Sequence, residues 1–96
     1  MTGLVKGGPQ SRRAAMLCAN PRFRLYLDQR RRQAHGLAHE QLPDGTHSEC
    51  DAADFIRASC NVASRAEIDH NDSAIHMLNK IVADYQEWER QQRRVG

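Results

Sequence analysis

The chain has 96 residues, of which 40% are hydrophobic and five are aromatic, and its formal net charge is +2. This length makes one small domain, and its apolar side chains fill a core too modest to enclose a catalytic cavity as well. The composition therefore argues against an enzyme with a buried small-molecule pocket, and we expect neither enzymatic activity nor a cofactor.

Both ends of the chain lack periodic apolar residues. Residues 1–10 contain three glycines and one proline, which predicts a flexible tail. Residues 90–96 contain three arginines and should fray, so we place a single helical domain at 11–92, followed by a frayed end at 93–96.

The longest apolar run, residues 14–19, is far shorter than the ~20 residues of a membrane span. We expect a cytoplasmic protein without membrane contact, whose three cysteines stay thiols.

The N-terminal half predicts two consecutive helices. The first spans residues 11–19 and ends before Asn20 and Pro21, because proline suits the first turn of the next helix and asparagine caps it. The second runs over residues 21–35, and Gly36 offers its stop. Its inward-facing positions are Phe23, Tyr26, Leu27 and Ala34.

A long connection leads to the third helix. Residues 36–47 contain a strong turn signal, Pro-Asp-Gly, at residues 43–45. Ser48 and Asp51 form a good N-terminal capping arrangement, so we predict a helix over about 49–59. The residues that this helix should bury are Ala52, Phe55 and Ile56.

The C-terminal half predicts a corner, a short helix and a long amphipathic helix. Residues 61–63 make the corner, and Ser64 and Glu67 form a capping box for a short helix that ends near Asp69. The long helix begins near Asp72 and carries one apolar stripe at helical spacing. The stripe consists of Ala74, Met77, Leu78, Ile81, Val82, Tyr85 and Trp88, with His76, Lys80, Asp84 and Glu87 on the other side.

These elements predict an all-α fold, a compact bundle of four to five helices with a long C-terminal amphipathic helix. The stripe of the last helix should pack against the apolar positions of the second and third helices. Trp88 lies near the helix end, where it forms either a lid on the core or the centre of a homodimer contact.

Charge is distributed unevenly along the chain. Residues 1–48 carry eight Lys and Arg against three Asp and Glu, whereas residues 49–96 carry six against nine. Several arginines on one helix can neutralise several phosphates, which supplies sequence-independent affinity for nucleic acid. The candidate nucleic-acid-binding residues are Arg12, Arg13, Arg22, Arg24, Arg31 and Arg32. The alternative is a solvated arginine-rich face that pairs with the acidic half of the same domain.

The helical positions of these arginines differ. Arg24 and Arg31 are seven residues apart and nearly aligned, so they are the best pair for one row of phosphate contacts. Arg30 aligns with Phe23 and should lie along the core edge with its head at the rim. We therefore predict that the double substitution Arg24→Ala, Arg31→Ala weakens DNA binding, flattens its salt slope by roughly two and leaves stability almost unchanged.

A helix-turn-helix interpretation of residues 51–69 is weaker. Such a unit needs an apolar anchor in its second helix, and Glu67 occupies that position. Asp69 and Asp72 would also place negative charge beside the DNA-reading face. An ordinary helical corner is the favoured interpretation.

The sequence also offers a possible zinc site and a possible catalytic cysteine, and for both a purely structural role of the same residues is favoured. His35 with His39, and His47 with Cys50, resemble the two arms of a zinc site, but a Cys-x-x-Cys arm is absent and surface histidines are the favoured interpretation. Cys60 could meet His70 across the corner and act as a nucleophile. It lies at an apolar helix end, however, where a buried and inert thiol is expected.

Residues 14–27 and 56–69, together with the helix that ends in the sequence Asp-Tyr-Gln-Glu-Trp at 84–88, carry a resemblance. Over residues 12–90 the chain resembles small uncharacterised proteins of temperate phages and prophages, encoded among replication and recombination functions. Similar sequences often have glycine at the corner, where this chain has Asn61, which also tolerates a left-handed conformation. The resemblance implies nucleic-acid-related work or interference with a host, and it assigns no site residue.

Two functional interpretations follow. The leading one is a non-enzymatic accessory protein of phage DNA metabolism that contacts nucleic acid through the arginine-rich helix. The alternative is a protein-interaction module that inhibits or modulates a host factor of defence or replication, through the same arginines or the acidic C-terminal half. Salt-dependent binding to duplex and single-stranded DNA separates the two.

Overall fold

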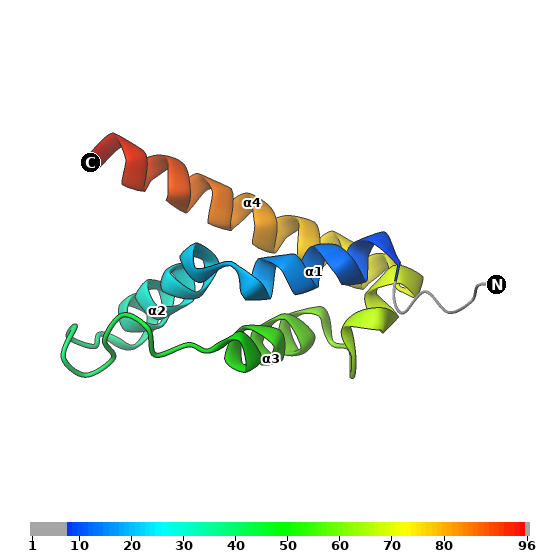
Figure 1. Ribbon diagram of the computed structural model, residues 1–96, viewed down its shortest axis with the longest axis horizontal. Coiled ribbons are helices and arrows are strands. Elements are labelled where there is room, and N and C mark those ends of the chain that lie inside the picture. Colours follow the sequence, from blue (N-terminus) through cyan, green and yellow to red (C-terminus); the bar gives the residue numbers. More distant parts are fainter. Residues whose placement is uncertain (1–7, 96) are drawn as a thin grey trace.

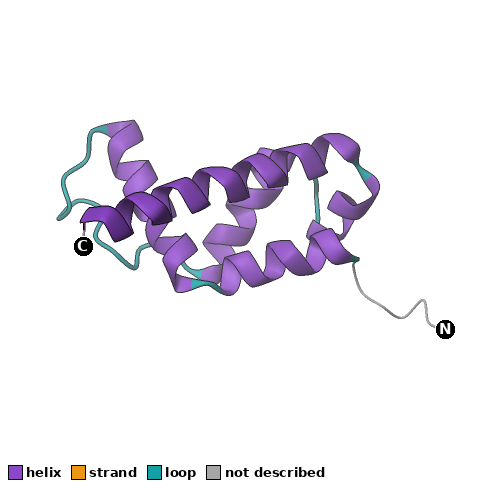
Figure 2. Cartoon of the chain, turned by 90° about the horizontal axis from the view of Figure 1, so that it is seen from above, coloured by secondary structure: helices purple, strands orange, loops and turns teal. Residues whose placement is uncertain are grey.

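The computed structural model describes residues 8–95, and this part of the chain contains helices, turns and loops but no strand (Figures 1 and 2). Its elements in chain order are α1 (Pro9–Ala19), α2 (Pro21–His35), α3 (Glu49–Cys60), the 3₁₀ helix η1 (Arg65–His70) and α4 (Asp72–Val95). The predicted all-α bundle with a long C-terminal helix is confirmed. In Figure 1, α4 lies on one side of α1 and α3 on the other, and η1 packs at the end where α1 begins.

Local caps set the boundaries of α2 and α3 where they were predicted. Asn20 Oδ1 accepts a hydrogen bond of 2.9 Å from the backbone N–H two residues later, and Pro21 occupies the first turn. Gly36 ends α2 in the left-handed conformation, with φ of 62°. Ser48 and Asp51 form the capping box of α3, because each side chain accepts a hydrogen bond from the other residue's backbone N–H. The sequence rules for caps therefore locate both helices.

The apolar stripe of α4 packs on side chains from every other helix. Leu78 is fully buried, and Ile81 and Tyr85 are almost so. Ala74 on α4 is fully buried as well, and the fully buried residues of the other helices in this core are Ala14, Cys18, Phe23, Ala52, Ile56 and Ile68. Trp88 is half-buried, stacks on Tyr85 and donates a hydrogen bond of 3.0 Å from Nε1 to Gln29 Oε1. Trp88 thus covers one end of the core as a lid.

Several positions predicted to face inward are less buried than expected. The prediction is wrong for Met77 of the α4 stripe, which is 37% exposed, and Tyr26 is only half-buried. The prediction for Ala34 is wrong, since this residue is exposed, and Phe55 is only half-buried. Both side chains line a cleft that remains open between α2 and α3. The physical reason is that these two helices do not close on one another at this point, so an apolar position on the correct helical face finds no partner.

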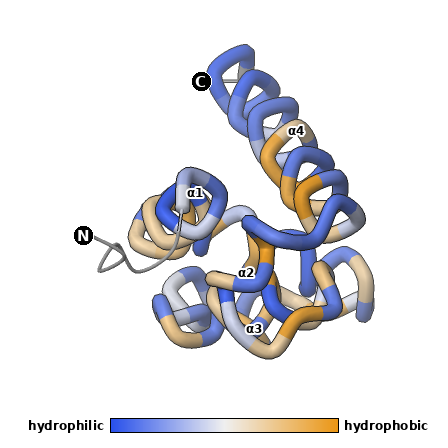
Figure 3. Tube along the Cα trace, turned by 90° about the vertical axis from the view of Figure 1, so that its right-hand side faces the viewer, coloured by the Kyte–Doolittle hydropathy of each residue, from blue (hydrophilic) through white to orange (hydrophobic). Residues whose placement is uncertain are grey.

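The last turns of α4 are helical, where fraying was expected. Figure 3 shows α4 changing from hydrophobic to hydrophilic residues towards its C-terminus. Ion pairs between neighbouring turns stabilise such a solvated helix end, and two are present, Arg90 with Glu87 and Arg93 with Glu89. The helix therefore continues through residues 93–95, while Gly96 lies outside the described residues.

α1 begins earlier than predicted. Gly8 is its N-cap and the helix starts at Pro9, so the predicted flexible tail is wrong for residues 8–10. Residues 1–7 of that predicted tail lie outside the described part of the chain. The difference arises because the cap of this helix comes from a distant residue rather than from the sequence that precedes it.

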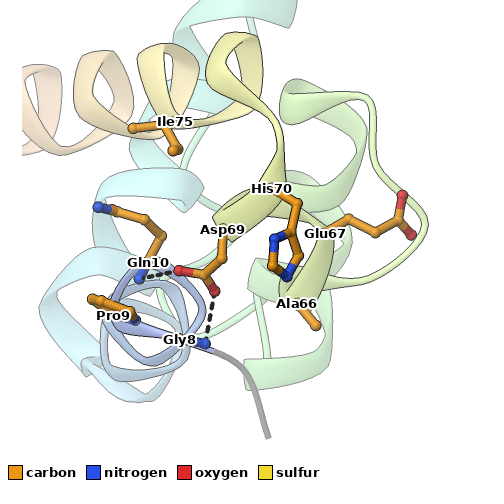
Figure 4. A pocket seen from close by; sticks show the side chains of 8 residues that line it. All are labelled: Gly8, Pro9, Gln10, Ala66, Glu67, Asp69, His70 and Ile75. Carbon is orange, nitrogen blue, oxygen red and sulfur yellow. Dashed lines mark hydrogen bonds between the residues drawn. The ribbon is translucent and has the colours of Figure 1, made fainter.

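Asp69 on η1 supplies this cap (Figure 4). Its carboxylate accepts hydrogen bonds of 2.8 Å from the backbone N–H groups of Gly8 and Gln10, and one of 3.1 Å from that of Ser11. A Cβ at position 8 would lie only 2.8 Å from Asp69 Oδ1, so the absence of a side chain at Gly8 permits the close approach. A negative charge at a helix N-terminus also complements the helix dipole. Asp69 therefore joins η1 to the start of α1.

The cap predicts a pH dependence of stability. Burial raises the pKa of the Asp69 carboxyl, but the backbone N–H groups of Gln10, Gly8 and Ser11 lower it by more, so this pKa lies below its usual value of 3.8. A lowered pKa in the folded state gives stability that is fully present above the unfolded-state pKa and is lost as pH falls through the folded-state pKa.

We expect Asp69→Asn to be less stable than the parent protein at about pH 7, and this difference to shrink as pH falls below about 4. Urea denaturation at a series of pH values measures it, and Glu40→Gln, in an exposed loop, is the matched control with little expected change. A difference between Asp69→Asn and the parent that stays constant down to about pH 2 would contradict the charged cap.

Candidate functional site

Most of the candidate arginines are engaged within the chain. Arg22 pairs with Glu89, with Nε 3.4 Å from Oε2, and its guanidinium lies 5.3 Å from the centre of the Trp88 ring. Arg24 Nη1 donates a hydrogen bond of 3.0 Å to the backbone carbonyl of Cys18, near the end of α1. These two side chains hold α2 against α4 and α1.

Arg32 and Arg13 have structural partners as well. Arg32 donates a hydrogen bond of 2.7 Å to the backbone carbonyl of Leu42 and pairs with Asp44 at 3.0 Å, which leaves only 13% of its side chain exposed. The hydrogen bond from Arg32 lowers the pKa of the Asp44 carboxyl. Arg13 donates a hydrogen bond of 2.6 Å to Asn79 Oδ1 on α4. Arg32 thus fixes the connection between α2 and α3, and Arg13 joins α1 to α4.

Two candidate arginines remain unengaged. Arg12 and Arg31 are exposed, and neither has a hydrogen-bonded side-chain partner or an ion pair within residues 8–95. They lie on different helices. Of the predicted row of phosphate contacts, Arg24 and Arg31, the first side chain is engaged with the backbone carbonyl of Cys18. Because Arg24 bonds the end of α1, removing it together with Arg31 should also cost stability, contrary to the last part of the sequence-based prediction.

Arg30 lies along the core edge, as its alignment with Phe23 indicated. Its guanidinium is 5.1 Å from the centre of the Phe55 ring on α3. A guanidinium over an aromatic face is attracted by the ring and keeps its edge N–H groups available. Arg30 therefore forms part of the boundary between α2 and α3, and its guanidinium also interacts with the hydroxyl of Tyr26 on its own helix.

An open cleft of about 540 Å³ lies between α2 and α3, and we call it the α2/α3 cleft. Its apolar surface comes from both helices and includes Leu27, Ala34, Phe55 and Ala58. Arg30, Arg31 and His35 line the α2 side, whereas Asp51 and Asp54 line the α3 side. The cleft thus combines an uncovered apolar floor with charged groups of opposite sign on its two walls.

The two walls differ in what they still offer to a ligand. Asp51 accepts a hydrogen bond from the backbone N–H of Ser48, which lowers the pKa of this carboxyl, and Asp54 pairs with Arg57 on its own helix. Arg31 on the opposite wall has no hydrogen bond or ion pair among the described residues, although its charge contributes to the lowered pKa of Asp51. The α2 wall therefore offers free donors, whereas the carboxylates of the α3 wall keep oxygen lone pairs that can still accept.

One end of the cleft is held by a buried carboxylate on α2. Asp28 is fully buried and accepts hydrogen bonds from the backbone N–H groups of Gly45, at 2.7 Å, and His47, at 2.9 Å. The Nδ1 atom of His47 lies 2.6 Å from the same carboxylate. Sequence reasoning missed this role of Asp28, because its partners are 17 and 19 residues away in a segment without helical periodicity.

A second groove, of about 680 Å³, lies where α1 begins (Figure 4). Its carboxylates are already used for capping, since Asp69 caps α1 and Glu67 accepts hydrogen bonds from the backbone N–H groups of Ser64 and Ala63. We assign it no binding role, because its acidic groups serve the fold.

The alternative sites weighed from the sequence are not assembled. The candidate zinc ligands do not come together: His47 Nδ1 contacts the carboxylate of Asp28, and His39 Nε2 lies 3.6 Å from that of Asp44. Within residues 8–95, no group of three or more His, Cys, Asp or Glu is placed to hold a metal ion. Cys60 is buried, and burial raises the pKa of its thiol, which disfavours the nucleophilic thiolate.

The corner after α3 is an ordinary helical corner. Asn61 adopts the left-handed conformation, with φ of 57°, as expected for this residue type. The element that follows is a 3₁₀ helix of six residues rather than an α-helix, and its Ile68 is fully buried. A recognition helix for a DNA groove is therefore missing at this place.

No family model, curated protein or solved structure matches the chain. The resemblance to proteins of temperate phages and prophages stays a prediction. Within residues 8–95, no helix combines the length and the apolar character that crossing a membrane requires.

Proposed function

We propose that the chain is a non-enzymatic protein-interaction module that binds and modulates a partner protein. The observation that supports this proposal is the α2/α3 cleft, whose apolar floor is uncovered beside an arginine without a partner among residues 8–95. Apolar surface rimmed by polar groups is typical of binding sites for other proteins. The host or phage origin of the partner is a prediction from the sequence resemblance alone.

The engagement of the arginines favours this function over nucleic-acid binding. Affinity for a phosphate backbone grows with the number of cations that reach it from one face. Arg13, Arg22, Arg24 and Arg32 are held by groups of their own chain. A nucleic acid would have to share these side chains with their present partners, whereas a protein partner can use the cleft as it stands.

DNA binding at low salt tests this choice. We expect the protein to bind labelled duplex and single-stranded DNA no more tightly than typical non-specific binding, about 10⁻⁴–10⁻⁶ M, with a salt slope of no more than about two. Fluorescence anisotropy over a series of salt concentrations measures both quantities, and a sizing run on the same samples tests the predicted homodimer through α4.

A steep salt slope of about four or more would overturn the proposed function in favour of nucleic-acid binding. The matched variants are Arg12→Ala and Arg31→Ala, because both residues are exposed and unengaged. If each flattens a steep slope by about one, the arginines act as phosphate contacts. If neither changes a shallow slope, DNA contact is incidental.

A further inference from the structure

The α2/α3 cleft has the size and shape for a short segment of a partner. Its volume of about 540 Å³ lies within the ~300–1,000 Å³ of typical ligand pockets. Ala34 and Ala58 are exposed at its surface and Phe55 is half-buried, so its floor has room for one or two apolar side chains. A flat contact between two folded domains would not need such a hollow. The shape therefore favours a linear peptide with an apolar anchor.

The free donors on the α2 wall of the cleft specify acceptors on this peptide. Arg30 and Arg31 are adjacent on the α2 wall, and the face of Phe55 orients the guanidinium of Arg30. Guanidinium groups bind carboxylates by paired hydrogen bonds, which are stronger than bonds between neutral groups. His35 follows one turn later on the same wall and adds a further polar contact.

The opposite wall distinguishes a peptide from a phosphate backbone. Asp51 and Asp54 line the α3 side of the cleft and would repel a continuous row of phosphates. A peptide can place a carboxylate on the arginine wall and direct a backbone N–H or an uncharged side chain towards the aspartates. The two walls thus set the orientation of the peptide as well as its chemistry.

The cleft is formed before any partner binds. Asp28 holds the connection through Gly45 and His47, and Arg32 holds it through the carbonyl of Leu42. The capping box at Ser48 fixes the start of α3 directly after this connection. A preformed site lowers the ordering cost of binding.

Resting on the proposed function, we propose that the α2/α3 cleft binds an acidic linear peptide, with an apolar side chain on Phe55 and Ala34 and a carboxylate on Arg31. Arg30, held on Phe55, contributes the second cationic contact. The occupant is a segment of a partner protein that carries at least one Asp or Glu next to a large apolar residue.

The probe is a fluorescein-labelled peptide in which a Leu-Phe pair is flanked by glutamates. Two matched peptides replace either the glutamates by glutamines or the Leu-Phe pair by serines. We expect the glutamate peptide to bind at least tenfold more tightly than either matched peptide, because a hydrogen bond to a charged group and a buried apolar side chain are each of that order. Amide NMR shifts on the folded protein should cluster around Ala34, Phe55 and Ala58.

Arg31→Ala should weaken the glutamate peptide about tenfold or more, and leave the glutamine peptide unchanged. Arg12→Ala is the control, since Arg12 is also exposed but lies on α1 outside the cleft. This variant should bind the glutamate peptide as tightly as the parent protein does. An unchanged protein NMR spectrum away from position 31 shows that the variant is folded.

The assignment of an acidic occupant is overturned if the glutamate and glutamine peptides bind equally well. It is also overturned if Arg31→Ala leaves the affinity for the glutamate peptide unchanged. Amide shifts located away from the cleft overturn the site. Neither result tests nucleic-acid binding. A steep salt dependence of DNA binding overturns the proposed function itself. The peptide and DNA experiments therefore distinguish a wrong peptide site from a wrong proposed function.

Discussion

Replacing Leu78 by alanine is expected to lower the free energy of unfolding by about 2–5 kcal/mol. Leu78 is fully buried on α4 and lies in one core with Phe23, Ile56 and Ile68, which are equally buried. The substitution removes apolar contact area and leaves a cavity that packed helices fill only in part. Since a domain of this size lies near the low end of the usual ~5–15 kcal/mol, a large share of the stability is at stake.

Urea denaturation followed by the fluorescence of Trp88, the only tryptophan of the chain, measures the effect. Gln86→Ala is the matched control, because Gln86 is on the exposed side of the same helix and should change stability by no more than about 0.5 kcal/mol. A loss below about 0.5 kcal/mol for both Leu78→Ala and Ile81→Ala would mean that the α4 stripe does not form the core.

Replacing Asp28 by alanine is expected to cost about 3 kcal/mol, because a buried carboxyl group with three hydrogen-bond partners is removed and each bond contributes about 1 kcal/mol. The backbone N–H groups of Gly45 and His47 lose their acceptor together with the His47 ring. The loss of stability should be largest in the connection between α2 and α3, which has no helix of its own.

Hydrogen exchange at the amides of Gly45 and His47 separates the local effect from global unfolding. Both amides should exchange much faster in Asp28→Ala, while the amides in the middle of α4 change only as far as the overall loss of stability requires. Glu40→Ala, in the same connection, is the control that should leave exchange unchanged. Unchanged protection of the two amides would contradict the role of Asp28.

The sequence alone predicts those parts of the fold that depend on neighbours within one or two helical turns. The cap at Asn20, the capping box at Ser48 and the stop at Gly36 each use groups no more than four residues away. The apolar stripe of α4 is likewise a local pattern, and a helix with such a stripe must bury it somewhere. These predictions were correct because the physical causes are local.

The candidate site was predicted less well, because the partners of its residues are distant in the chain. Arg13 and Arg22 bond residues of α4 that are 66 and 67 positions away. An exposed arginine on a helical wheel and an arginine bound to another helix have the same sequence pattern. For the same reason, nothing in the sequence around Ala34 indicated that α3 would leave this residue uncovered.

The cap of α1 by Asp69 also constrains the order in which the chain can fold during synthesis. Gly8 and Asp69 are separated by 61 residues, and ribosomes add roughly 5–20 residues per second. The start of α1 therefore waits for several seconds after its own residues have been synthesised, whereas a helix forms in about a microsecond. Until η1 emerges, the side of α1 that carries Ala14 and Cys18 has no complete surface to pack on. Among the helices described, α1 is thus translated first but is one of the last to be finished.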